Sequence, residues 1–203
     1  MQSTIRIPTR CWWTGYDKKG GWGDFYPPRS AVNLAGLNQT DMANGPGFRV
    51  SIFVSGCRNH CEGCFNKETW DFSYGKPFEE YRDFILKELE RPYIEGLTVL
   101  GGEPFEPENQ EGLAPFLEKV KQRFPNKTIW CYTGYTFDKD LLPGERKYTP
   151  YTDRMLSCID VLVDGRFILA ERDVTLKFRG SKNQRLIDMK KTREENAVCE
   201  ISN

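Results

Sequence analysis

The sequence predicts an α/β fold with a mainly parallel sheet, and two observations lead to this prediction. From Phe48 onward, short runs rich in β-branched and aromatic residues alternate with segments whose apolar residues recur every three or four positions. Strands that alternate with helices in this way are typical of βαβ units, whose strands pair in parallel. The chain has 203 residues, which suits one domain because domains commonly span about 100–200 residues.

Each expected strand is a short apolar run. These runs read FRVSIFV, GLTVL, TIWCY and IDVLV, at residues 48–54, 96–100, 128–132 and 159–163. In parallel sheets, functional sites lie at the carboxyl ends of the strands. We therefore expect a site built from the segments that follow these strands, namely 55–66, GGEP (101–104), TGY (133–135) and DGRF (164–167).

Helices are expected between the strands, at residues 77–90, 114–124 and 151–158. In the first of these, apolar residues recur at spacings of three and four from Phe78 to Leu89, which predicts one buried face. Pro115 limits the second prediction, because proline is tolerated mainly in the first turn of a helix.

Residues 1–33 are expected to form an irregular N-terminal extension, since their stretch KKGGWGDFYPP cannot sustain a helix or a long strand. The extension holds Trp12, Trp13 and Trp22, and it carries five basic and two acidic residues. We expect it either to pack on the domain through its tryptophans or to form a separate partner site.

Composition narrows the classes of function. The chain has 29 basic and 29 acidic residues, so it lacks the excess of positive charge that is typical of nucleic-acid-binding proteins. No apolar run reaches the ~20 residues of a membrane-spanning helix, and the N-terminus has no apolar stretch typical of a secretory signal. We therefore expect a cytoplasmic protein that binds neither nucleic acid nor membranes, and whose seven cysteines are metal ligands or buried thiols rather than disulfides.

The segment GCRNHCEGCFN (56–66) places Cys57, Cys61 and Cys64 within eight positions. Soft thiolate ligands select zinc, copper(I) or iron–sulfur clusters. A 4Fe-4S cluster is usually held by four cysteines, so three of them leave one iron with an exchangeable position. An open position on a metal is what a catalytic site needs and a structural site avoids.

Two other readings of the three cysteines stay open. They could form a structural zinc site, whose fourth ligand would be His60 or a distant cysteine. They could also be the buried face of a helix, although Asn59 and Gly63 are poor helix formers. The cluster is the interpretation that we favour. The other four cysteines, Cys11, Cys131, Cys158 and Cys199, are expected not to be ligands.

The motif Cys57-x3-Cys61-x2-Cys64, followed by GGEP at 101–104, resembles the radical S-adenosylmethionine (SAM) enzymes. A narrower resemblance spans roughly residues 40–190 and rests on NGPGFRVSIFVSGCRNHCEGCFNKETW (44–70), WCYTGY (130–135), DVLVDGRF (160–167) and FRGSKNQRLID (178–188). These segments are similar to the anaerobic ribonucleoside-triphosphate reductase-activating proteins, a family of glycyl-radical enzyme activases. Two features depart from common patterns. Gly63 stands where many superfamily members have an aromatic residue, although GCFN fits the activases, and the N-terminal extension has no counterpart in short activases.

The resemblance implies a radical SAM domain over residues 34–203, with a partial (βα) barrel of the radical SAM type. Cys57, Cys61 and Cys64 would ligate the 4Fe-4S cluster. Gly63, Cys64 and Phe65 would contact SAM through the backbone, and Gly101, Gly102 and Glu103 would border its methionine end. No side chain is expected to act as a general acid or base.

The resemblance also implies the reaction. The reduced cluster would cleave SAM to methionine and a 5′-deoxyadenosyl radical, which would abstract a hydrogen from one glycine of the partner. The partner would be the large glycyl-radical subunit of the anaerobic ribonucleoside-triphosphate reductase, and a flavodoxin or ferredoxin-type protein would donate the electron.

For several further residues near these motifs, the sequence leaves two alternative roles open. Phe53, Phe65 and Trp70 would shield the cluster, or would be ordinary core residues. His60 would be a solvated loop residue or a hydrogen-bonding neighbour of the cluster. Four polar side chains of RGSKNQR would contact SAM or the partner, or would lie on a solvated strand edge; these are Arg179, Asn183, Gln184 and Arg185.

Two alternative functions remain at this point. One is a radical SAM enzyme that acts on a small molecule, because the deazaguanine-forming synthase resembles the same arrangement of cysteines and GGEP. The other is a zinc-stabilised interaction module without enzymatic activity.

Overall fold

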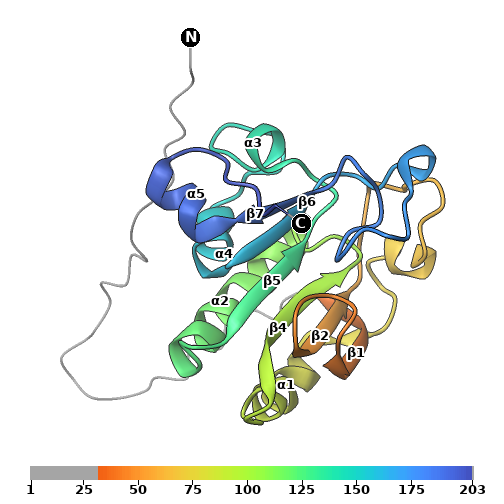
Figure 1. Ribbon diagram of the computed structural model, residues 1–203. Helices are drawn as coiled ribbons and strands as arrows, with labels where there is room; N and C mark the ends of the chain where they lie inside the picture. The colour runs from red at the N-terminus through yellow and green to blue at the C-terminus, as the bar shows by residue number, and fades with distance from the viewer. Residues whose placement is uncertain (1–31, 203) are drawn as a thin grey trace.

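The computed structural model describes residues 32–202, which form a mixed α/β domain around one sheet (Figure 1). Within these residues the sheet has seven strands in the order β3-β1-β2-β4-β5-β6-β7. Their bounds are β1 Asn33–Asp41, β2 Phe48–Val54, β3 Lys76–Pro77, β4 Ile94–Gly101, β5 Thr128–Tyr132, β6 Val161–Asp164 and β7 Arg185–Asp188. The central strands β2, β4, β5 and β6 run parallel, whereas β1, β3 and β7 are antiparallel to their neighbours. The mainly parallel sheet is therefore confirmed.

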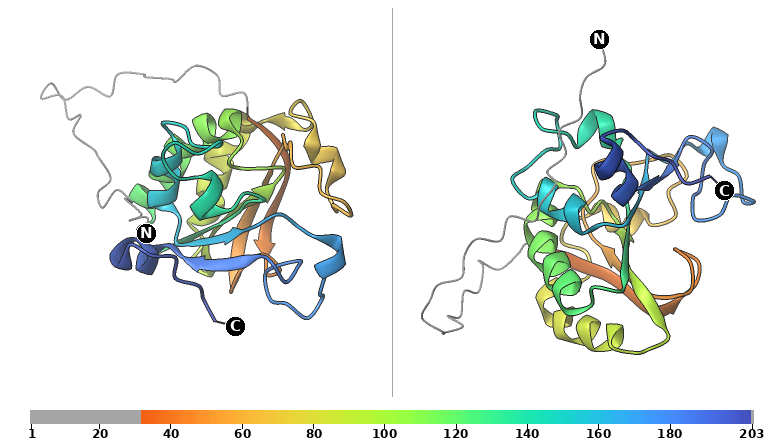
Figure 2. Two further views of the ribbon diagram at one scale, coloured as in Figure 1. Left: turned by 90° about the horizontal axis from the view of Figure 1, so that it is seen from above. Right: turned by 60° about the vertical axis from the view of Figure 1, so that its left-hand side comes forward.

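The helices are short except for one. Their bounds are α1 Arg82–Leu89, α2 Pro107–Arg123, α3 Phe137–Asp140, α4 Thr152–Cys158 and α5 Met189–Glu195, and 3-10 turns lie at η1 Lys67–Trp70, η2 Phe78–Tyr81 and η3 Leu169–Glu171. Helices α1, α2 and α4 lie on the same side of the sheet (Figures 1 and 2). None of the helices within residues 32–202 combines the length and the apolar character that crossing a membrane requires.

The main core lies between these helices and one face of the sheet. Alternate strand residues such as Ile52, Val99 and Ile129 point into it, where they meet Leu89 of α1 and Phe116 of α2. Alternation places every second strand residue on this face, so the apolar pattern of the sequence could predict the strands. Burying each such side chain contributes about 1.5–3 kcal/mol to the free energy of folding.

The opposite face of the sheet is more polar near the amino ends of its strands. Arg49 of β2 is fully buried there and donates hydrogen bonds to the Thr98 hydroxyl at 2.7 Å, the Thr128 hydroxyl at 2.9 Å and the carbonyl oxygen of Leu97 at 2.8 Å. A fourth bond reaches the Thr128 carbonyl oxygen at 2.9 Å. Gly96 leaves room for this guanidinium, because a Cβ at that position would lie 2.9 Å from Nη2 of Arg49.

The structure corrects several predicted boundaries. The strands predicted at 48–54 and 128–132 have those bounds, while the other two shift to Ile94–Gly101 and Val161–Asp164. In the segment predicted as a helix at 77–90, Pro77 belongs to β3 and the 3-10 turn η2 follows it. The chain becomes α-helical only at Arg82. The helix predicted at 151–158 starts one residue later, at Thr152.

The helix predicted at 114–124 is much longer, because α2 begins at Pro107. Pro107 is at the first position of the helix, where its missing N–H costs no hydrogen bond. Pro115 lies inside α2, although we expected proline mainly in the first turn of a helix. Strands β1, β3 and β7 and helices α3 and α5 were not predicted; only Leu34 and Asp41 of β1 (NLAGLNQTD) are buried, so this strand lacks a regular apolar pattern. The extension was predicted at residues 1–33, of which 1–31 lie outside the described part of the chain. Its predicted end is too late, because Val32 is buried and Asn33 already begins β1.

Candidate functional site

A cavity of about 250 Å³ opens at the carboxyl ends of the parallel strands. All four segments that were expected to form a site contribute to it. Its lining comprises Cys57, Asn59, Cys61, Cys64, Phe65, Asn66, Thr69, Trp70, Leu100, Gly101, Gly102, Glu103, Tyr132, Thr133, Gly134, Gly165, Phe167, Gly180 and Gln184. The topology therefore brings the cysteine motif and GGEP to one place, as the alternation of strands and helices predicted.

The three cysteines of the motif share this cavity. Cys57 is buried, while Cys61 and Cys64 are partly exposed. Burial is the main cause that raises the pKa of Cys57 to about 12, and the charge of Glu103 adds to it. A thiolate in such surroundings needs a positively charged partner, and coordination to a metal deprotonates a thiol. These thiols thus suit a metal centre better than a free reactive cysteine.

Seven of the eight predicted site residues line the cavity, and the exception is Gly63. Gly63 adopts a φ of +72°, and a Cβ there would lie 2.8 Å from Cδ1 of Leu169. This glycine lets the cysteine loop pack against the chain that follows β6.

Two glycines let the end of β4 approach the cysteine loop closely. Gly101 has a φ of +113°, and a Cβ there would lie 2.6 Å from the backbone nitrogen of Val54. A Cβ on Gly102 would lie 2.6 Å from the carbonyl oxygen of Gly56. Because only glycine lacks a Cβ, both positions explain why a Gly-Gly pair follows the strand. The backbone N–H of Glu103 then donates to the Gly56 carbonyl oxygen at 2.8 Å.

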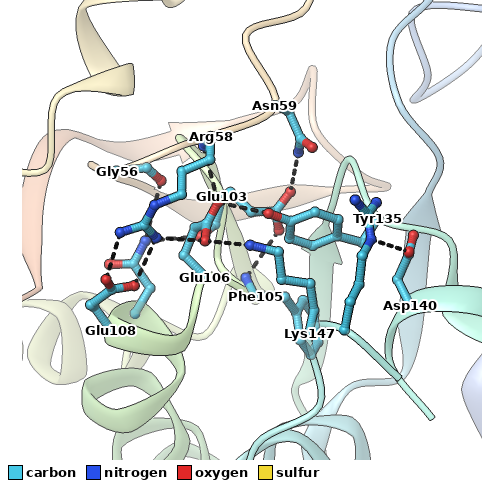
Figure 3. A network of polar contacts seen from close by, with 12 residues as sticks. Gly56, Arg58, Asn59, Glu103, Phe105, Glu106, Glu108, Tyr135, Asp140 and Lys147 are labelled. Atoms are coloured by element: carbon cyan, nitrogen blue, oxygen red, sulfur yellow. Dashed lines mark hydrogen bonds and ion pairs between the residues drawn. The ribbon is translucent and has the colours of Figure 1, made fainter. Parts of the chain in front are cut away.

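The buried carboxylate of Glu103 joins three loops of the cavity (Figure 3). It accepts hydrogen bonds from the Asn59 amide at 3.0 Å, the Thr133 hydroxyl at 2.7 Å and the Gly134 backbone N–H at 2.7 Å. The backbone N–H of Phe105 donates a fourth, at 3.0 Å. Burial raises the pKa of Glu103 to about 7, although these hydrogen bonds favour its charged form. Glu103 therefore fixes the cysteine loop relative to the ends of β4 and β5.

A second buried carboxylate, Glu106, lies beside the first (Figure 3). It accepts hydrogen bonds from the Arg58 backbone N–H at 3.0 Å, the Arg58 guanidinium at 2.8 Å, the Tyr135 hydroxyl at 2.6 Å and the Lys147 ammonium at 2.9 Å. Burial opposes the charged form of Glu106, but the bonds from Tyr135, Lys147 and Arg58 outweigh it and lower the pKa of the carboxyl group. Since Arg58 follows Cys57 directly, Glu106 anchors the cysteine loop beside the first cysteine of the motif.

Asn109, in the first turn of α2, also holds the loops. Its amide donates to the carbonyl oxygens of Ser55 at 2.9 Å and Glu103 at 2.8 Å. Neither Glu106 nor Asn109 was predicted from the sequence. The signal that could have found them is their position directly after GGEP, at the start of the next helix.

The RGSKNQR segment folds back onto the DGRF loop. Gln184 donates to the carbonyl oxygen of Gly165 at 3.0 Å, and Asn183 donates to that of Arg166 at 2.8 Å. Arg185 pairs with the buried carboxylate of Asp164 at 2.6 Å. These side chains are half-buried and hydrogen-bonded within the chain, and Arg185 lies on β7, the edge strand of the sheet. Both expectations for this segment, a contact with SAM or the partner and a strand edge, therefore stay predictions. Arg179 likewise donates to the Gln184 carbonyl oxygen at 2.7 Å, and of the four predicted residues only Gln184 lines the cavity.

The aromatic residues near the motif divide into two groups. Phe65 and Trp70 line the cavity, and the His60 ring stacks on Trp70 with 4.4 Å between ring centroids. Phe53 is not in the lining and packs against Gly36 of β1 instead. His60 is exposed, as the prediction of a solvated loop residue requires.

The remaining cysteines that the structure describes lie away from the cavity. Cys131 and Cys158 are buried in the main core, and Cys199 lies in the C-terminal segment, whereas Cys11 falls outside the described residues. Among residues 32–202, no three Cys, His, Asp or Glu side chains converge as ligands of a single metal ion. A 4Fe-4S cluster does not require such convergence, because each cysteine binds a different iron.

Comparison with known proteins agrees with this site. A family model described as a 4Fe-4S single cluster domain matches residues 43–187. The anaerobic ribonucleoside-triphosphate reductase-activating protein of Haemophilus influenzae is 43% identical over 156 residues, which cover 75% of this chain and 96% of the relative. The protein of that name from Enterobacteria phage T4 is 41% identical over 158 residues, covering 76% and 93%, and that from Escherichia coli K12 is 37% identical over 147 residues, covering 71% and 90%. The resemblance is confirmed, and the chain belongs to the family of anaerobic ribonucleoside-triphosphate reductase-activating proteins.

Proposed function

We propose that this protein activates an anaerobic (class III) ribonucleotide reductase by reductive cleavage of SAM at a 4Fe-4S cluster, which leads to a glycyl radical on the reductase. The observation that carries the proposal is the single cavity shared by Cys57, Cys61, Cys64 and the GGE of GGEP. The names of the relatives support the choice of partner.

The residues of the cavity fit a cluster with one iron left open. Three cysteine thiols are the soft ligands that iron–sulfur clusters take, and no fourth cysteine of the described chain lines the cavity. We assign Cys57, Cys61 and Cys64 as the ligands. When bound, the cluster supplies the electron that splits the sulfonium of SAM, and the resulting organic radical takes the glycine hydrogen.

The chain itself provides positioning and shielding for this chemistry. Gly101 and Gly102 allow a ligand to approach the backbone, and Gly63, Cys64 and Phe65 would present backbone groups to SAM on the other side. Glu103 would border the methionine end, with its carboxylate held in place by the donors of the neighbouring loops. No general acid or base is needed.

The aromatic ring of Trp70 at the cavity would limit the access of water to a bound cluster, whereas Phe65 lines the cavity but is 74% exposed. Low polarity around an iron–sulfur cluster is one of the factors that set its reduction potential. We interpret the sheet as a partial (βα) barrel of the radical SAM type, whose open site lies at the carboxyl ends of the strands. Reduced thiols suit a cytoplasmic location, and a flavodoxin or ferredoxin-type protein would supply the electron.

The proposal is tested on protein purified without oxygen. We expect enough iron and sulfide for one 4Fe-4S cluster per chain. Addition of SAM and a strong reductant should yield 5′-deoxyadenosine. Cys61→Ala should lose 5′-deoxyadenosine formation, whereas the control Cys199→Ala, outside the cavity, should keep it.

Two results would contradict the proposal. One zinc ion per chain without iron would support the interaction module instead. Formation of 5′-deoxyadenosine that depended on a small substrate, with no radical on the reductase, would support a radical SAM enzyme that acts on small molecules.

A further inference from the structure

The chain between β6 and β7 carries apolar side chains that remain exposed. Val174 is 83% exposed, and Ile168 and Leu169 of the same segment are also exposed. Phe65 of the cysteine loop is 74% exposed. We call Phe65, Ile168, Leu169 and Val174 the rim patch. Large apolar side chains that gather on a surface commonly mark an interaction site.

Most of the rim patch lies beside the cavity: Phe65 lines it, Ile168 follows the lining residue Phe167, and Leu169 packs against the cysteine loop. Phe65 and Phe167 both line the cavity, with 6.5 Å between their ring centroids. Arg172, two residues before Val174, lies over the Phe65 ring at 5.2 Å, and Leu169 packs where a Cβ on Gly63 would lie. Figure 1 shows the segment after β6 running beside the loop after β2. A large partner that inserts a residue into the cavity would therefore meet Phe65 and Leu169 beside the opening.

The segment that carries most of the patch is positively charged. Residues 165–184 contain five basic and two acidic residues, although the whole chain has a net charge of zero. Lys177 and Lys182 are exposed in this segment. An apolar surface with basic residues around it suits a partner that presents acidic residues around an apolar contact.

We infer that the rim patch is the docking surface for the reductase, and that it receives an acidic region of the reductase beside the glycine that becomes the radical. This inference rests on the proposed function, since a glycine of a partner can reach the cavity only if the partner covers its mouth. Charge argues against two other occupants. Residues 1–33 are themselves positively charged, with five basic and two acidic residues, and a second copy would present the same basic segment.

The test measures the affinity of the full chain for the reductase at several salt concentrations. We expect Val174→Asp to weaken binding at least about tenfold, because it places a charge in the apolar contact and repels an acidic partner. The double variant Lys177→Glu and Lys182→Glu should also weaken binding and reduce its dependence on salt. Partner-free cleavage of SAM should be unchanged in both variants.

Matched controls lie elsewhere on the surface. Met42 is 65% exposed and follows β1, near the amino ends of the parallel strands, so Met42→Asp should bind as wild type does. Lys119→Glu with Lys190→Glu, on α2 and α5, should likewise leave the salt dependence unchanged.

Wild-type affinity in both rim variants would overturn the inference. If the wild type proved to be a dimer and Val174→Asp a monomer, a second copy of the chain would be the occupant instead of the reductase. If Val174→Asp also lost SAM cleavage through misfolding, the affinity of the double variant Lys177→Glu and Lys182→Glu for the reductase would decide the test. Failure of the proposed function is separate, because it would appear as absent SAM cleavage in the wild type.

Discussion

Replacing Glu106 by Gln tests how the cysteine loop is anchored. Glu106 accepts four hydrogen bonds, of which two come from the cationic groups of Arg58 and Lys147. A glutamine can keep its carbonyl oxygen toward Tyr135 and the backbone of Arg58, but its NH₂ group then faces both cations. Two charge-assisted hydrogen bonds are lost.

The magnitude follows from burial. A hydrogen bond to a charged group contributes about 1.5–3 kcal/mol. The Lys147 side chain is only 16% exposed, so we expect its hydrogen bond to contribute an energy in this range. The Arg58 side chain is 50% exposed, and solvent reduces its contribution to about 0–1 kcal/mol. We therefore expect Glu106→Gln to lower the free energy of unfolding by about 3 kcal/mol.

The assay is urea unfolding of the metal-free protein, with Glu108→Gln as the matched control. Glu108 binds the same Arg58, at 2.7 Å, but its side chain is 41% exposed, so this variant should lose less than about 1 kcal/mol. In the reconstituted protein, Glu106→Gln should also release iron to a chelator faster than Glu108→Gln does. Equal unfolding free energies of the two variants would refute the reasoning.

Three further predictions concern the loops and the sheet. Gly101→Ala should cost about 4 kcal/mol of stability through its positive φ and its contact with backbone, whereas Gly144→Ala, with a φ of +93° and nothing within 4 Å of a Cβ, should cost about 1 kcal/mol in the same unfolding assay. The raised pKa of Glu103 contributes stability that is fully present below its unfolded pKa near 4.5 and is lost as pH rises through about 7. Between pH 4.5 and 8 the metal-free wild type should therefore lose about 3 kcal/mol more than Glu103→Gln, measured by urea unfolding at each pH. Arg49→Met should lower the melting temperature strongly because it leaves buried oxygen atoms unpaired, while Arg154→Met, at a half-exposed pair with Glu118, should change it little.

Each of these predictions has an outcome that contradicts it. Equal losses for the two glycine variants would mean that the close approach of β4 to the cysteine loop is not needed. Parallel pH profiles of the wild type and Glu103→Gln would exclude the raised pKa. Similar melting temperatures for the two arginine variants would show that the network around Arg49 contributes little.

The sequence predicted the elements whose apolar residues follow a regular period. The strands at 48–54 and 128–132 were found with their bounds, because every second residue faces the main core. The start of α2 was missed for a physical reason: Asn109 and Gln110 are fully or almost fully buried there. Their amides hydrogen-bond to backbone carbonyls of the site and of neighbouring loops, so polar residues occupy positions where a helix usually shows apolar ones.

The sequence predicted those parts of the candidate site that belong to the cysteine motif and to GGEP. Cysteine spacing and the Gly-Gly pair identified residues that line one cavity. The junctions made by Glu103 and Glu106 depend on contacts between loops that are far apart in the chain, such as the bond from Thr133 to Glu103. No local pattern indicates which side chain a buried carboxylate will meet. Gln184 was named from the sequence with two alternative roles, because its place in the cavity depends on how β7 returns beside β6.

The most direct test mixes the reduced, reconstituted protein with SAM and the reductase, and records the electron paramagnetic resonance spectrum. We predict a glycyl radical signal on the reductase, formed together with 5′-deoxyadenosine and absent when Cys57→Ala replaces the wild type. Full radical yield from a protein that lacks any one of Cys57, Cys61 and Cys64, or no radical from a wild type that holds its complete cluster, would contradict the central claim that three thiols leave one iron open for SAM.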